Sequence, residues 1–81
     1  MRTAPTYEET IELLRAPFRR ARVTKPIYAF NFQLEPGDVV SAKPYHNDPD
    51  GYVSIRHRGP DGEPHEWTEY DDRIEYLEAQ A

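Results

Sequence analysis

The sequence predicts a mostly β fold, α+β at the margin, in which a short N-terminal helix precedes a small barrel or half-barrel of about five short antiparallel strands. The apolar residues recur with a period near 3.6 up to residue 14 and with a period of 2 from residue 27. The turn tripeptide Pro-Asp-Gly occurs twice, at 49–51 and 60–62. We therefore expect one domain over residues 1–81, with a helix at 6–16 and a β-meander barrel at 19–78.

The segment 6–16 has both a start and a stop signal of a helix. Thr6 and Glu9 fit a capping box, and Pro17 disfavours helical geometry at the residue before it. The apolar side chains lie at i, i+4 and i+7, which is helical spacing: Tyr7, Ile11 and Leu14. A helix this short is not stable alone, so we expect it to dock on the barrel or on a partner.

Strands are expected near residues 20–25, over 27–34 and over 39–45. In the second, aromatic and aliphatic residues occupy every other position and predict one inward-facing side: Tyr28, Phe30, Phe32 and Leu34. Residues 35–38 contain Pro-Gly at the centre of a type II turn. Pro44 requires an edge or a bulge because it has no N–H to donate.

Each Pro-Asp-Gly predicts a three-residue hairpin loop built on a type I turn and a G1 bulge. The two loops bracket a strand at 52–58, and the second leads into 63–70. Counting outward from residues 60–62 places Ile55 opposite Trp67 on one face. On the other face it predicts three favourable cross-strand pairs: Tyr52–Tyr70, Ser54–Thr68 and Arg56–Glu66. Residues 71–78 predict a turn and then a short strand or a single helical turn.

This order of strand, meander hairpins, 3₁₀ turn and final strand resembles SH3-like barrels. The resemblance is one of layout. The chain lacks the acidic-aromatic ligand-binding motifs of SH3 domains, so no functional residue is transferred from them.

Size and composition argue against an enzyme. The chain has 81 residues, no cysteine and 37% hydrophobic residues, and a domain this small has little room for a deep dry cleft beside a core. No Gly-rich phosphate loop or oriented nucleophile is present, so we predict no catalytic residue and no cofactor. Because disulfides, a signal segment and an apolar span are not evident, we expect a cytoplasmic protein without a membrane partner.

The three histidines fall on or beside the meander. The register places His57 opposite His65, with His46 on the neighbouring hairpin. Since tight ligand spacings are missing, we predict no metal and expect half-exposed, hydrogen-bonded rings. A zinc site that adds Asp61 or Glu63 is the alternative.

The two halves of the chain differ in net charge. Residues 1–45 carry a net +2 and residues 46–81 a net −7, in a total of −5. Tyrosines among carboxylates are typical of a protein interface that attracts a basic partner. We predict a non-catalytic intracellular protein-binding or regulatory module, one form of which is an inhibitor occupying a partner's nucleic-acid site. The expected binding residues are Tyr52, Tyr70, Glu66, Glu69, Asp71 and Asp72.

Two alternatives stay open. The tyrosine pair could simply cover the sheet. The basic stretch could instead make the domain a nucleic-acid-binding barrel, although the acidic total charge opposes a polyanion; its residues would be Arg15, Arg19, Arg20, Arg22 and Lys25. A homo-oligomer is also compatible with the sequence, because the helix or a strand edge could be shared between chains.

Overall fold

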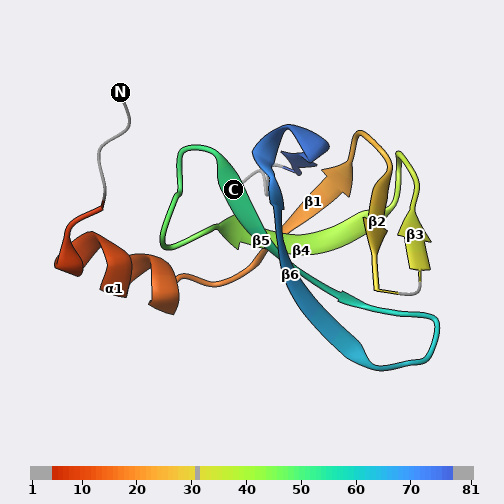
Figure 1. Ribbon diagram of the computed structural model, residues 1–81, viewed down its shortest axis with the longest axis horizontal. Helices are drawn as coiled ribbons and strands as arrows, with labels where there is room; N and C mark the ends of the chain where they lie inside the picture. Colours follow the sequence, from red (N-terminus) through yellow and green to blue (C-terminus); the bar gives the residue numbers. More distant parts are fainter. Residues whose placement is uncertain (1–4, 31, 78–81) are drawn as a thin grey trace.

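The computed structural model describes residues 5–30 and 32–77 and confirms a mostly β protein with one short helix (Figure 1). Its elements in chain order are α1 (Tyr7–Arg15), β1 (Arg19–Val23), β2 (Ile27–Ala29), β3 (Phe32–Leu34), β4 (Val39–Pro44), β5 (Tyr52–Arg58), β6 (Pro64–Tyr70), η1 (Asp71–Arg73, a 3₁₀ turn) and β7 (Ile74–Tyr76). Five strands form one antiparallel sheet in the order β6-β5-β4-β1-β7, and β2 pairs with β3 separately. The described strands do not close into a barrel, so the SH3-like barrel stays a prediction.

The helix begins and ends where the sequence predicts. The Thr6 hydroxyl oxygen accepts from Glu9 N at 3.1 Å, and the Glu9 carboxylate accepts from Thr6 N at 2.8 Å, which completes the capping box. No residue of α1 is buried. Its last turn is tied to the sheet by Lys43, whose Nζ donates to the carbonyl oxygens of Leu14 and Ala16, both at 3.1 Å. The helix thus docks by its C-terminal end (Figure 1).

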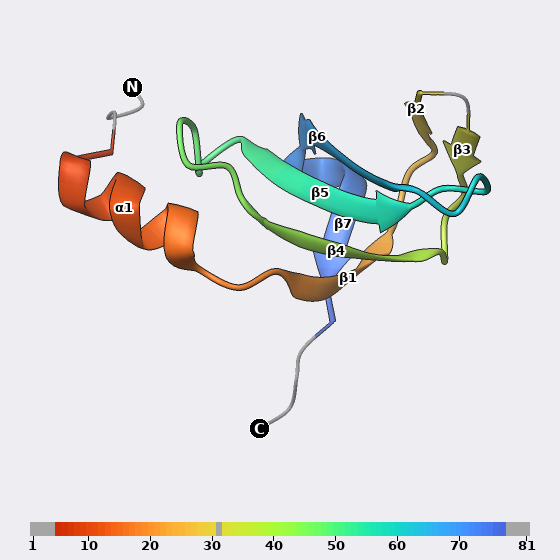
Figure 2. The same cartoon turned by 90° about the horizontal axis from the view of Figure 1, so that it is seen from below.

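The core lies on one face of the five-stranded sheet, here called the inner face. Alternation along the strands sends small and β-branched residues to this face: Ala21, Val23, Val40, Ala42, Val53, Ile55 and Ile74. Ile27 and Leu34 of the β2–β3 hairpin complete the buried cluster. In Figure 2 this hairpin stands at the end of the sheet opposite α1.

The prediction of a single strand over 27–34 is wrong. The chain turns after Ala29, and Ile27 pairs with Leu34 while Ala29 pairs with Phe32. Paired residues of a hairpin share a face, so the turn changes which positions point inward. Tyr28 and Phe30 are therefore 72% and 65% exposed, contrary to the expected inward aromatic face.

The two Pro-Asp-Gly loops differ. At the second, Gly62 has φ +82° and donates to the Gly59 carbonyl at 2.9 Å, as predicted for the three-residue loop. The first prediction is wrong. Tyr45 N donates to the Tyr52 carbonyl at 3.1 Å, which closes a six-residue loop over 46–51, and Gly51 does not adopt a positive φ.

The register of β5 and β6 is the predicted one, with Ile55 opposite Trp67 and Tyr52 opposite Tyr70. After β6 the chain makes the 3₁₀ turn η1, and β7 then pairs with β1. Pro44 extends beyond the last residue that β1 pairs, Ala42, so its missing N–H falls at an open edge of β4. These pairings put all five strands in one sheet. The core lies on one face of this sheet, and the candidate functional site lies on the opposite face.

Candidate functional site

The face opposite the core, here called the outer face, begins with three neighbouring tyrosines at one end. Tyr52 and Tyr70 are paired across β5 and β6, and their rings stack with centroids 5.1 Å apart at 28°. The hydrogen bond from Tyr45 N to the Tyr52 carbonyl brings β4 alongside. Tyr45, Tyr52 and Tyr70 form the tyrosine row, and Tyr70 is 55% exposed.

The middle of the outer face is covered by the segment between α1 and β1. Phe18 lies over it, with the Arg56 guanidinium carbon 4.2 Å and Lys43 Nζ 5.0 Å from its ring centroid. Ser54 is only 7% exposed although it lies on this face. Cation–π contacts of this kind hold a linker in place, and here they separate the tyrosine row from the arginines beyond.

At the other end, arginines surround an open groove of about 310 Å³. Arg20, Ser41 and Arg56 are cross-strand neighbours on β1, β4 and β5, and Arg58 follows two residues later on the same face. We call this the arginine groove. The remaining lining residues are Val39, Val40, His57 and Pro64.

The structure brings together part of the predicted protein-binding set. Tyr52, Tyr70 and Glu66 share the outer face, and Glu66 forms an ion pair with Arg56 at 3.2 Å. Glu69 lies on the inner face, where its carboxylate accepts from the Trp67 indole N–H at 3.2 Å.

The two remaining members of that set lie in η1. Asp71 is exposed, and its N–H donates to the Gly51 carbonyl at 3.1 Å, which joins η1 to the loop beside the tyrosine row. Asp72 accepts from Lys25 Nζ at 3.0 Å. This hydrogen bond is the main cause that lowers the pKa of the Asp72 carboxyl below its ordinary value.

The predicted nucleic-acid set is divided. Arg22 is paired with Glu75 at 2.6 Å, and Lys25 with Asp72. Arg19 lies over the Tyr76 ring, 4.3 Å from its centroid, and Arg15 belongs to the last turn of α1. Arg20 is the member that lines the arginine groove. The sequence did not predict that Arg56 and Arg58 lie beside Arg20. For Arg56 the β4–β5 register could have indicated it, because that register pairs Arg56 with Ser41.

A second feature missed by the sequence is a cluster of rings that the β2–β3 hairpin and the β5–β6 hairpin share. Phe30 lies 4.6 Å from the ring centroid of His65, and Phe32 lies 5.8 Å from that of Trp67. Of these rings, Phe32 and Trp67 pack against the core. The exposure of Phe30 extends the cluster to the surface.

The histidines do not assemble into a metal centre. His57 faces His65 across β5 and β6, but His46 lies in the other hairpin loop with its ring 4.8 Å from Tyr45. Among the described residues no three His, Asp or Glu side chains are placed to hold a metal ion. His65 Nε2 lies 3.4 Å from Asp61; the pKa of this aspartate is lowered, chiefly by a hydrogen bond from the Glu63 N–H.

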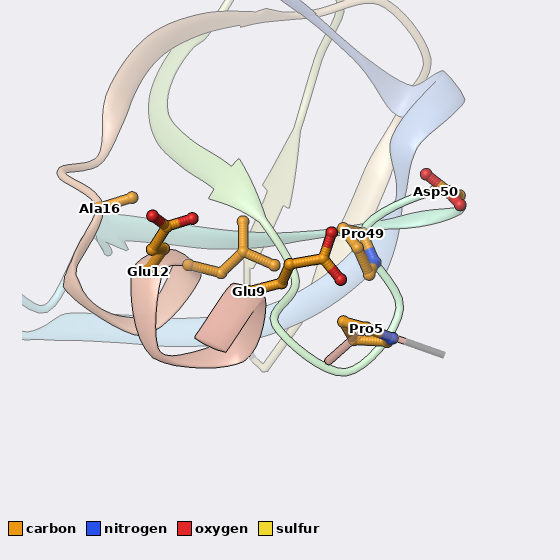
Figure 3. A pocket seen from close by; sticks show the side chains of 7 residues that line it. Pro5, Glu9, Glu12, Ala16, Pro49 and Asp50 are labelled. Carbon is orange, nitrogen blue, oxygen red and sulfur yellow. The ribbon is translucent and has the colours of Figure 1, made fainter. Parts of the chain in front are cut away.

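An open cavity of about 590 Å³ separates α1 from the β4–β5 loop (Figure 3). Leu13, Ala16 and two prolines form its apolar part, and three carboxylates border it. The acidic residues are Glu9, Glu12 and Asp50. Because Asp50 is two residues from Tyr52, this acidic region continues the end of the molecule that bears the tyrosine row.

No family model, curated protein or solved structure matches the chain. Within residues 5–30 and 32–77, no helix is long and apolar enough to cross a membrane.

Proposed function

We propose that the protein is a non-catalytic protein-binding module that contacts its partner through the tyrosine row. The observation that carries the proposal is the stacked Tyr52–Tyr70 pair, which keeps a polar tip and a large ring area at the surface. Tyrosine is enriched in interface cores because it gives contact area at low entropic cost. A stacked pair is already ordered, so binding would immobilise little more.

The partner we propose is basic. The loop beside the tyrosine row carries Asp50, which is exposed, and Asp71 lies against the same loop. Glu9 and Glu12 continue the negative charge along α1. An acidic rim attracts a Lys/Arg-rich surface and raises its association rate. An inhibitor that occupies the nucleic-acid site of a cytoplasmic partner is one regulatory role that fits this chemistry.

The scaffold we propose is an SH3-like small barrel or half-barrel. The order of the strands, the 3₁₀ turn before the last strand and the return of β7 to β1 support it. Nucleic acid is the weaker candidate for the ligand, because Arg22 and Lys25 are neutralised by carboxylates from the C-terminal region.

The test compares two exposed tyrosines. Tyr70→Ser removes a member of the row, and Tyr28→Ser removes a ring that is 72% exposed on β2, away from the row. Quantitative affinity capture with wild type and both variants, followed by binding measurements on the purified partner, should show roughly tenfold weaker binding for Tyr70→Ser. Tyr28→Ser should bind as the wild type does.

Circular-dichroism melts of the same proteins separate binding from folding. We expect both variants to melt close to the wild type, because both side chains are largely exposed. A large fall in the melting temperature of Tyr70→Ser alone, with unchanged partner binding, would assign the tyrosine pair to stability instead.

A further inference from the structure

The arginine groove stands out by the charge of its lining. The chain has fifteen Asp and Glu against ten Lys and Arg, yet the groove is lined by Arg20, Arg56 and Arg58 and by no carboxylate. Glu66 pairs with Arg56 from outside the groove lining, and the positive charges that line the groove repel one another unless an anion lies between them. We infer that this groove binds the phosphate group of a small organic phosphate, a role that does not depend on the tyrosine row.

Strand pairing fixes the arrangement of the donors. Ser41 is opposite Arg20 on one side and opposite Arg56 on the other. Two strand spacings separate the two arginine backbones by about 10 Å, a distance that two long side chains can close from both sides. Ser41 lies between the two arginines, and its hydroxyl supplies a further donor to an anion that bridges them.

Two of the arginines are already held in position. Arg56 is fixed by Phe18 and by one hydrogen bond to Glu66, and Arg58 donates to the Gly62 carbonyl. A guanidinium has five N–H donors, so each keeps several for a ligand. Ordering before binding lowers the entropic cost of capture. Arg20 has no carboxylate partner among the described residues, which leaves its charge available.

A small phosphate fits this donor set better than a long polyanion does. Guanidinium forks match phosphate oxygens in bidentate geometry, and about 310 Å³ leaves room for a small group attached to the phosphate. A nucleic-acid strand would extend beyond the groove toward the acidic residues of the second half of the chain, which repel it. The observations therefore favour one phosphate group at a time.

The test is an NMR titration of the ¹⁵N-labelled protein with inorganic phosphate, and separately with phenyl phosphate, at constant ionic strength. We expect saturable shifts at the amides of Arg20, Ser41 and Arg56 and at arginine Nε–H. Arg20→Gln should raise the Kd roughly tenfold, as expected when a hydrogen bond to a charged group is lost. The matched control is Arg22→Gln, on the same strand and face but engaged by Glu75; its Kd should not change.

Two further comparisons define failure. Equal losses for Arg20→Gln and Arg22→Gln, or equal shifts with sodium chloride, would overturn the inference, because they indicate only general electrostatics. If a single-stranded oligonucleotide displaces phosphate and binds more tightly as it lengthens, the groove is a nucleic-acid site instead. Arg20→Lys keeps the charge without the fork and should bind with an intermediate Kd; binding equal to wild type would contradict a bidentate site.

Discussion

The two faces of the five-stranded sheet are made by the same strands but follow different rules. At the centre of the inner face the residues are small or β-branched, as with Ala21, Val40 and Ile55, and they are almost completely buried. On the outer face the cross-strand neighbours are matched by chemistry, as in Tyr52–Tyr70 and Arg56–Glu66. The inner face therefore determines stability, and the outer face is free to determine recognition.

The difference also explains where the aromatic residues are. The largest fully buried side chains are Ile27, Ile55 and Val23, none of them aromatic. Phe32 and Trp67 pack against this cluster from its end and stay partly exposed. Because the centre of the core is thin, each buried aliphatic residue carries a large share of the stability.

The sharpest test of this division is Ile55→Ala. Ile55 is 0% exposed on the inner face, and removing three buried carbons should lower the free energy of unfolding by about 2–5 kcal/mol. Urea denaturation at pH 7 measures the change. The control is Thr68→Ala, exposed on the outer face of the adjoining strand, which should change the same quantity by about 0.5 kcal/mol or less. Equal losses for the two variants would contradict the conclusion that the inner face determines stability and the outer face does not.

The β5–β6 half of the sheet could be predicted because one turn determines the register of both strands. Once residues 60–62 form the loop, alternation assigns every partner from His57–His65 to Tyr52–Tyr70. The β2–β3 hairpin could not be found in this way. Its turn places Phe30 at φ +54°, a conformation usually taken by Gly, Asn or Asp, so the segment shows the alternation of a strand and lacks the Gly or Pro that marks the other turns.

The sites were predictable to the extent that they depend on local pairing. The Tyr52–Tyr70 and Arg56–Glu66 pairs follow from the hairpin alone. The partners of Arg22 and Lys25 lie 53 and 47 residues away, and they come close only because β7 returns to β1. Nothing in a single sequence measures such a long-range pairing, so the loss of these cations from the nucleic-acid set could not be predicted.

Acid should affect the ionic contacts at the sheet edge and not the packing of the inner face. The pKa of Asp72 is lowered in the folded protein by Lys25, so its contribution is present above the unfolded pKa near 3.9 and is lost as pH falls through the folded value. Melting temperatures from pH 7 to pH 2 should show wild type above Asp72→Asn at neutral pH. The two should converge below about pH 4.

The size of this effect is small because both partners are more than half exposed. Lys25→Gln is the matched control, since it removes the same contact from the other side and should show the same convergence. A difference between wild type and Asp72→Asn that stays constant at all pH values would mean that the carboxylate acts through packing or backbone geometry and not through its charge.

The smallest expected effect on global stability comes from α1. Thr6→Ala removes the capping hydrogen bond, which costs a helix about 1 kcal/mol, but α1 buries no residue. Amide exchange at Glu9 and Thr10 should therefore speed up by roughly fivefold, while the urea midpoint stays within error of the wild type. If the midpoint falls as it does for Ile55→Ala, α1 belongs to the cooperative core. An unchanged midpoint instead makes α1 a separate unit, held to the sheet by Lys43 and able to open without unfolding the strands.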